Sequence, residues 1–383
     1  MTSLVEIQAV ATVERGRFVP AAHLKNMRNG YVPYIRPSDF TNAHNLAAEL
    51  GLPKEDLVHH RLNLLPQGTT LIVPHYGRLG DLFPKAILLT TEATTNQNVF
   101  SIIPNLKHCH PKYLCYAIQY EIECLIDDLG FSSELSTRTL CEMEIPLPSL
   151  PEQAEIVDIL DAATQIVDLR QRQLVMLGEL IRSTFRSMFG NTAVQTTKPL
   201  DACTELYLPR PLGKQDEETD DSEEEETLPL VTPGDIHGTW IRQTRRTITE
   251  QEVSQSNLRA LPEKSIVIIT RGARSGLPGI LSFPAVIAPN CIALPPSTEY
   301  VPEFLFYHLM SNLSGIQKLQ EGAAMQMLPT RALRELPVPI VPPENQRRFA
   351  DFAGDVEEQW QLIDRSRLNS ETLFDRLLDD IFA

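Results

Sequence analysis

Two long stretches of the chain repeat apolar residues every seven positions. Such a repeat, kept over four to five heptads, is typical of a coiled-coil seam. It predicts long helices over 151–192 and 342–383, and Pro151 and Pro343 suit a first helical turn, where a missing N–H costs little. The residues expected to pair the helices are Leu160, Val167, Leu174, Ile181 and Met188 in the first stretch and Val356, Trp360, Ile363, Phe374, Leu377 and Ile381 in the second.

Both predicted helices carry enough apolar surface to need a partner. We expect them to form an antiparallel coiled coil, in which the start of one helix lies beside the end of the other. The polar seam residues Arg170, Arg367 and Ser370 then help to fix the register, at some cost in stability. The alternative is that each helix covers only its own domain.

The helices belong to a repeat that covers the whole chain. Residues 34–40 read YIRPSDF, and LVTPGDI follows 196 positions later; Ile145-Pro146 returns as Val338-Pro339 after 193 positions. The order of matching segments is kept while the offset drifts by only a few residues. The sequence therefore predicts a pseudo-two-fold repeat of two halves.

Each half mixes short β-rich runs with Pro, Gly and Asn turns before its long helix. Apolar runs at 70–73 and 266–269 are typical of buried strands, and short helices are expected at 111–127 and 302–318. The predicted fold class is α+β. It has two similar mixed, β-rich domains with small helices, over 1–150 and 193–341, separated by the two long helices.

Charge at first argues against a nucleic-acid partner. The 383 residues include 34 Lys+Arg and 50 Asp+Glu, a net charge of −16 with a pI near 5.1. Nine of the acids fall in residues 216–226, and without them the net charge is −7. We interpret 214–227 as a solvated acidic loop; the alternative is a segment that mimics DNA and competes with it.

Other classes of protein are disfavoured by what the sequence lacks. No apolar run reaches the length of a membrane span and no signal segment opens the chain, which favours a soluble, cytoplasmic protein. The six cysteines show no CxxC spacing, so no metal site is expected. Phosphate-loop, zinc-protease and nucleophile-elbow motifs are missing, so no catalytic residue is predicted.

Polar residues in the turns between strands are candidates for reading DNA, because Arg pairs with guanine and Asn or Gln with adenine. Arg78 and Arg274 rank first, since each half keeps Arg-x-Gly after a buried strand; the alternative for any such residue is an ordinary solvated position. Asp39 and Asp235 also repeat, but we interpret them as structural turn residues. The candidate readers are Arg36, Ser38, His75, Tyr76, Arg78, Asn96, Gln97, Asn98, Thr137 and Arg138 in the first half and Thr232, Arg242, Arg245, Arg271, Arg274, Asn290, Gln326, Thr330 and Arg331 in the second.

The joint between domain and helix resembles a known family. Residues 145–160 read IPLPSLPEQAEIVDIL, similar to the proline-rich phrase with a following Gln and Ile that leads into the long helix of type I restriction-modification specificity subunits. Residues 338–349, VPIVPPENQRRF, are a degraded second copy. The order of domain, helix, domain, helix is similar as well, over nearly the whole chain.

The resemblance implies a non-catalytic subunit whose two target recognition domains read a bipartite double-stranded DNA site. It implies two modification subunits that bind the helices, carry S-adenosylmethionine and methylate adenine at N6. It allows two restriction subunits that use ATP and Mg, and it places no cofactor in this chain. Alternatives of the same architecture are a protein–protein scaffold, an antirestriction decoy, or the specificity subunit of another phage-defence system.

Overall fold

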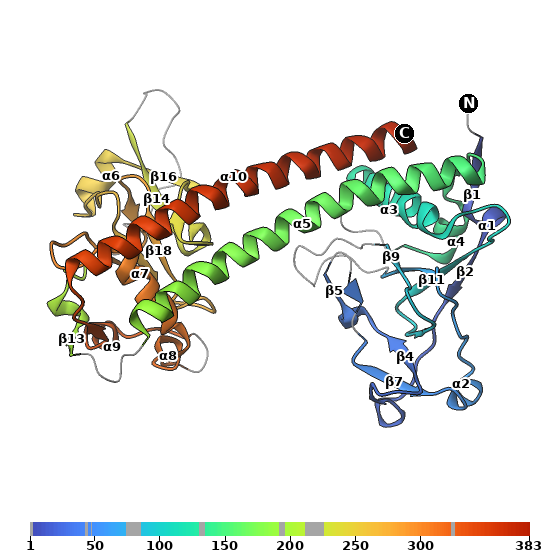
Figure 1. Cartoon of the computed structure of the whole chain (residues 1–383), viewed down its shortest axis with the longest axis horizontal. Coiled ribbons are helices and arrows are strands. Elements are labelled where there is room, and N and C mark those ends of the chain that lie inside the picture. The colour runs from blue at the N-terminus through green and yellow to red at the C-terminus, as the bar shows by residue number, and fades with distance from the viewer. Residues whose placement is uncertain are drawn as a thin grey trace. The chain divides into compact units, whose positions relative to one another are not determined.

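The structure is a computed structural model that describes residues 3–42, 45–46, 48–73, 86–129, 135–190, 196–210, 226–322 and 326–383. The chain divides into two compact units, Met1–Arg170 with Arg365–Ala383, and Gln171–Asp364. Each unit holds one β-rich head and part of both long helices (Figure 1). The candidate readers His75, Tyr76 and Arg78, and the acidic loop up to residue 225, lie outside the described residues.

The head of the first unit is built on two four-stranded sheets, ordered β2-β11-β8-β9 and β10-β4-β7-β3. Three clusters of buried apolar side chains pack these sheets, and one of them includes residues of both sheets, Ile35 and Leu71. The helix α3 (Pro111–Leu129) covers the first sheet. The strands are β1 (Leu4–Glu6), β2 (Ala11–Arg15), β3 (Lys25–Asn26), β4 (Tyr31–Ile35), β5 (Phe40–Asn42), β6 (Asn45–Leu46), β7 (Leu50–Pro53), β8 (Thr70–Ile72), β9 (Ile87–Leu88), β10 (Thr94–Thr95), β11 (Phe100–Pro104) and β12 (Glu144–Pro146). The helices of this head are α1 (Ile7–Val10), η1 (Ala21–His23), η2 (Pro37–Asp39), α2 (Asp56–His59), α3 (Pro111–Leu129) and α4 (Thr137–Glu142).

The head of the second unit repeats this plan with a four-stranded sheet, β15-β18-β17-β20, and a three-stranded sheet, β16-β14-β19. The central strand β17 reads IVII and is buried along its whole length. The strands are β13 (Thr197–Pro199), β14 (Thr227–Val231), β15 (Trp240–Ile241), β16 (Arg246–Thr249), β17 (Ile266–Ile269), β18 (Pro278–Leu281), β19 (Val286–Ile287), β20 (Cys291–Leu294) and β21 (Pro337–Pro339). The helices are η4 (Leu200–Ala202), η5 (Pro233–Asp235), α6 (Glu250–Gln255), α7 (Pro302–Ser311), α8 (Leu313–Gln317) and α9 (Thr330–Arg334).

The predicted repeat is present in the backbone itself. The parallel pair β4–β10 of the first head returns as β14–β19, and the antiparallel pair β1–β12 returns as β13–β21. Arg61 and Asn257, 196 positions apart, both have positive φ, at 52° and 49°. Such a conformation is uncommon for a residue other than glycine, so its recurrence marks the same turn in both halves.

The two long helices are α5 (Leu150–Phe189) and α10 (Pro343–Phe382), each of 40 residues and therefore about 60 Å long. Their positions agree with the predicted ranges to within three residues. At the start of α5 the backbone N–H and the hydroxyl of Ser149 both donate to the carboxylate of Glu152, at 2.9 and 2.7 Å. These bonds hold the pKa of the Glu152 carboxyl below its usual value.

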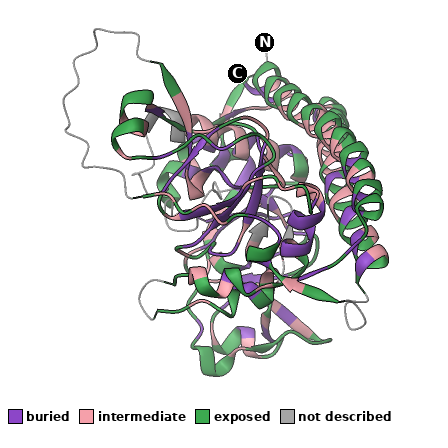
Figure 2. Ribbon diagram, turned by 90° about the vertical axis from the view of Figure 1, so that its left-hand side faces the viewer, coloured by how far each residue is buried: buried purple, intermediate pink, exposed green. Residues whose placement is uncertain are grey.

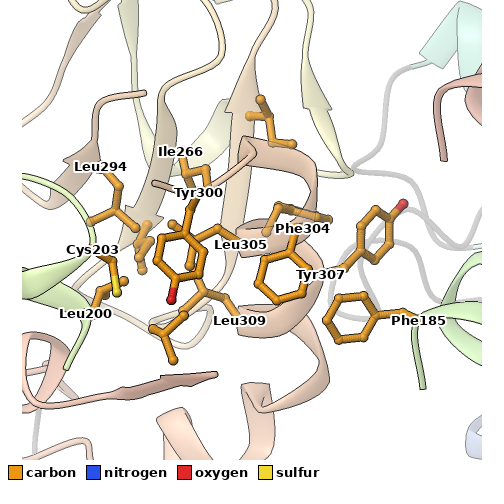
Figure 3. Close-up of a cluster of buried hydrophobic side chains, with 14 of the residues drawn as sticks. Phe185, Leu200, Cys203, Ile266, Leu294, Tyr300, Phe304, Leu305, Tyr307 and Leu309 are labelled. Atoms are coloured by element: carbon orange, nitrogen blue, oxygen red, sulfur yellow. The ribbon is translucent and has the colours of Figure 1, made fainter. Parts of the chain in front are cut away.

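The antiparallel pairing is confirmed within each unit. In the first unit Leu160, near the start of α5, shares a buried cluster with Leu378 and Phe382 at the end of α10. In the second unit Phe185, near the end of α5, contacts Phe349 at the start of α10, with ring centroids 5.1 Å apart. Figure 3 shows Phe185 among the buried aromatic side chains of that core.

All the predicted pairing residues are at least partly covered, but the seam drifts along α10. Leu160, Leu174, Ile181 and Val356 are buried, and the others are half-buried. At the end of α10 the buried residues are Leu378 and Phe382, one position after the predicted ones. An α-helix drifts by about 20° per heptad against a strict seven-residue repeat, so after four heptads the buried face moves on by about one residue.

The helix predicted over 302–318 is interrupted. The helix α7 ends at Ser311 and α8 starts at Leu313, because Asn312 leaves the helical conformation with φ −105° and ψ 10°. Its side-chain amide donates to the carbonyl of His308 at 2.9 Å, a local hydrogen bond that competes with the helical pattern.

The buried residues are concentrated in the strands of the two heads (Figure 2). No described helix is long and apolar enough to cross a membrane.

Candidate nucleic-acid interface

The repeated turns after β4 and β14 are built around a buried aspartate. Asp39 is 2 % exposed and accepts from the backbone N–H and the guanidinium of Arg36, at 2.8 Å each. Asp235 is 9 % exposed and accepts from the backbone N–H and hydroxyl of Thr232, at 2.8 and 2.7 Å. These contacts support the interpretation of both aspartates as turn residues. As a result, the guanidinium of Arg36 and the hydroxyl of Thr232 already have hydrogen-bond partners within the chain.

Arg274 hydrogen-bonds to the turn that contains Asp235. Its guanidinium donates to the carbonyl oxygens of Pro233 and Ile236, the latter at 3.0 Å, and lies 3.3 Å from Nδ1 of His237. Because the guanidinium only donates, Nδ1 of His237 must be the acceptor. Arg274 thus lies in the turn region predicted to read DNA, with its donors directed at its own backbone.

The asparagine candidates also build turns. Asn96 donates to the hydroxyl of Tyr34 at 3.0 Å and accepts from the backbone N–H of Asn98 at 2.9 Å. The carbonyl of Asn290 accepts from both the N–H and the hydroxyl of Thr270, at 2.9 Å each. The side chain of Asn290 is not used in these bonds.

Three arginine candidates form surface ion pairs. Arg138 pairs with Glu142 at 2.8 Å, Arg331 pairs with Glu335 at 3.0 Å, and Arg242 pairs with Glu357. The pairs of Arg138 and Arg331 are exposed to solvent, which screens them, so their guanidinium groups can be released to a phosphate at little cost. Glu357, the partner of Arg242, is only 14 % exposed. Thr137 and Thr330 are the first residues of α4 and α9, the short helices that carry Arg138 and Arg331.

The structure brings two candidates of the second head together. The backbone of Arg271 bridges to that of Met327, and Gly272 donates its N–H to the carbonyl of Gln326 at 3.0 Å. Both Arg271 and Gln326 are exposed. Gly272 has φ +93°, a conformation that favours glycine, so the turn depends on the absence of a Cβ. We call Arg271 and Gln326 the Arg271 edge.

Three further candidates, Ser38, Gln97 and Arg245, are exposed. The sequence analysis missed an exposed basic group in the first head, Lys25, Arg28 and Arg61. Lys25 lies in β3, which pairs with β7, Arg28 lies over the ring of Tyr31 of β4 at 4.3 Å from its centroid, and Arg61 follows α2.

Electrostatics in the heads do not favour nucleophilic chemistry at three cysteine thiols, two of them buried and that of Cys115 half-buried. Burial raises the pKa of Cys109, Cys115 and Cys291 to about 12, which keeps these thiols protonated. Burial also raises the pKa of Tyr34, so its hydroxyl remains a donor to the carbonyl of Arg17 at 2.8 Å. Among the described residues, no group of three or more His, Cys, Asp or Glu side chains could hold a metal ion.

Comparison with known proteins decides the family. The type I restriction modification DNA specificity domain matches residues 3–177 and 213–369, one copy in each half of the repeat. The chain belongs to the type I restriction-modification specificity family. The prediction made from the proline-rich joint is thereby confirmed.

Relatives within this specificity family are distant. The chain is 26 % identical over 174 residues to the Escherichia coli type I restriction enzyme EcoR124I/EcoR124II specificity subunit, over 40 % of this chain and 42 % of the relative. It is 27 % identical over 181 residues to the type I restriction enzyme MjaIX specificity subunit of Methanocaldococcus jannaschii, over 45 % of this chain and 40 % of the relative. Each match therefore covers less than half of the relative's own length.

The fold is similar to that of solved specificity subunits. The crystal structure of the S subunit of the type I restriction-modification system from M. genitalium has a TM-score of 0.57 at 15 % identity, covering 100 % of this chain and 96 % of that one. A chain from a study of complex assembly and conformational transition of the type I system has a TM-score of 0.56 at 15 % identity, covering 99 % and 97 %. At 15 % identity these similarities show a shared fold and nothing more specific.

Proposed function

We propose that this chain is the DNA-specificity subunit of a type I modification or restriction complex and reads a bipartite target with its two heads. The observation that carries the proposal is the duplicated specificity domain, one copy to each head. The heads share a backbone plan but differ in their exposed side chains, Lys25, Arg28 and Arg61 in the first and the Arg271 edge in the second. Two such heads suit two different half-sites.

The long helices offer surface for partner subunits. Along α5 the exposed apolar residues Ile159, Ile166, Leu169 and Met176 are spaced by seven residues in two pairs, Ile159 with Ile166 and Leu169 with Met176. This pattern repeats the coiled-coil spacing on a face that α10 does not cover. We propose that two methyltransferase subunits bind the helices there and supply S-adenosylmethionine, and that restriction subunits, where present, supply the ATP- and Mg-dependent steps.

The acidic composition fits a reader that depends on its partners. A net charge of −16 weakens binding to phosphates, so partner subunits supply much of the phosphate contact. The isolated chain is then expected to bind DNA more weakly than the complex and with a shallower salt dependence. Equal affinities and equal salt slopes for the two would contradict this division of labour.

Methylome sequencing tests the proposed function directly. Cells that produce this chain with its methyltransferase partner should methylate adenine at N6 within one bipartite motif. We expect Arg271→Ala with Gln326→Ala to relax or weaken one half of that motif and leave the other half unchanged, which is the internal control. A methylome without any bipartite motif would overturn the proposal. Deleting 214–227 then separates the alternatives, since a decoy loses function and a reader keeps or gains DNA affinity.

A further inference from the structure

Each long helix buries one glutamine in its first turn. Gln153 of α5 is 0 % exposed and Gln346 of α10 is 1 % exposed, and the two are 193 positions apart. Glutamine is mostly an exposed residue, so two fully buried copies at equivalent positions need a physical reason.

Gln153 joins three segments of the first unit through one amide. Its Oε1 accepts from the backbone N–H of His110 at 2.7 Å, immediately before α3. Its Nε2 donates to the carbonyl of His108 at 3.0 Å and to that of Pro148, in the proline-rich connector, at 2.9 Å. The long helix, the connector and the segment that leads into α3 therefore meet at this side chain.

Gln346 makes the same three contacts in the second unit. Its Oε1 accepts from the backbone N–H of Val301 at 2.9 Å, immediately before α7. Its Nε2 donates to the carbonyl of Glu299 at 3.3 Å and to that of Val341 at 2.9 Å. Each partner lies 191 or 193 positions after its counterpart, so the arrangement is repeated atom for atom.

Only an amide satisfies this arrangement. One acceptor and two donors are needed on the same planar group, and a carboxylate supplies no donor while a thioether supplies neither in useful strength. Removal leaves one backbone N–H and two backbone carbonyls without that partner. The rest of the joint, including the pairs β1–β12 and β13–β21, is retained in that case.

We propose that Gln153 and Gln346 are positioning residues that fix the direction in which each head leaves its long helix, and thereby the DNA spacer length that the complex accepts. This inference rests on the proposed function. For a loop that lies roughly 20 Å from the joint, a rotation of the head by about 10° moves the loop by about 3.5 Å, which is close to the rise of one base pair. Small changes at the joint therefore reach the scale at which spacers differ.

Gln153→Met and Gln346→Met test the proposal because methionine keeps the volume of the side chain and removes its hydrogen bonds. Each variant is assembled with the methyltransferase subunits and given DNA with the native spacer or a spacer one base pair longer or shorter. We expect the preference for the native spacer to fall by at least about fivefold, the effect of a lost hydrogen bond, with both half-site sequences still read. Exposed Gln165→Met in α5 and Gln361→Met in α10 are the controls and should keep the preference.

Hydrogen exchange shows whether the contact is broken. The amides of His110 and Val301 should lose protection in the respective methionine variants and keep it in the controls. Lost protection with an unchanged spacer preference would overturn the positioning role. If a methionine variant fails to fold, Gln153→Glu and Gln346→Glu, which keep the acceptor and lose the donors, test the spacer preference; the amides of His110 and Val301 should keep their protection in these variants.

Failure of the proposed function and failure of the spacer role give different experimental results. A wild-type complex without a bipartite motif removes the proposed function and the spacer role with it. A wild-type complex with a fixed spacer, unaltered in both sets of variants, removes the spacer role alone.

Discussion

Polar side chains in the turns of this protein are used largely by the chain itself. Arg36 and Thr232 donate to buried aspartates, and Arg274 donates to two backbone carbonyls of a neighbouring turn. A guanidinium in such a place holds a loop in shape. Arg271 and Arg274 are both exposed, but the donors of Arg274 are directed at its own backbone, so Arg271 is the better candidate to meet a phosphate or a base edge.

Arg274→Ala should therefore act first on stability. Its loss leaves the carbonyls of Pro233 and Ile236 without this donor, and we expect the free energy of unfolding of the second unit to fall by about 1–2 kcal/mol. Chemical denaturation followed by a probe in that unit measures the change. Arg271→Ala is the matched control, because Arg271 is exposed as well but does not hold this turn, and it should change the free energy of unfolding by less than about 0.5 kcal/mol. An unchanged stability in Arg274→Ala would return this residue to the group of direct readers.

At the scale of elements, aromatic packing helps to hold the long helices in both units. In the first unit Phe374 and Phe382 of α10 contact tyrosines of α3, with ring centroids 5.5 to 6.3 Å apart. In the second unit Phe185 and Phe189 of α5 lie against Phe304 of α7 and Phe349 of α10, with ring centroids 4.9 to 5.8 Å apart. One helix end is thus tied to its head and to the opposite helix at once. Aromatic pairs of this kind add to the stabilisation that burial provides.

Phe185→Ala should loosen this end of the helix pair. The side chain is 4 % exposed, and truncation of a buried phenylalanine costs about 3–5 kcal/mol. We expect a large fall in the thermal midpoint of the second unit. Met176→Ala on the same helix removes a side chain that is 66 % exposed and should have almost no effect, so equal shifts for the two variants would contradict the packing described here.

At the scale of the whole molecule, the division of the chain does not follow the order of the sequence. The first unit takes residues from both ends of the chain, and α5 and α10 each contribute to both units. Each of the buried clusters in the described residues nevertheless belongs to one unit alone. Separate cores predict separate cooperative units of unfolding.

Native-state hydrogen exchange should resolve these two units. Ile122→Ala removes a fully buried side chain of α3, and we expect core amides of the first unit to lose about 2–5 kcal/mol of protection. Core amides of the second unit, such as those of β17, should keep theirs. An equal loss in both units would show that the continuous helices make the molecule unfold as one.

The amino-acid sequence by itself determined the repeat, the two long helices and their antiparallel partnership. These follow from periodic apolar positions and from matching segments 191 to 196 residues apart, which are visible along the chain. The family resemblance rested on equally local evidence, the proline-rich joint.

The tertiary structure alone decided which polar residues are engaged and which are exposed. The partners of Arg274 lie about 40 positions away and those of Gln153 up to 45 positions away, so no local pattern reveals them. It also decided where the seam of α10 runs, because helical drift accumulates over several turns, and where the helix after residue 302 breaks, because a single asparagine amide competes with the backbone there.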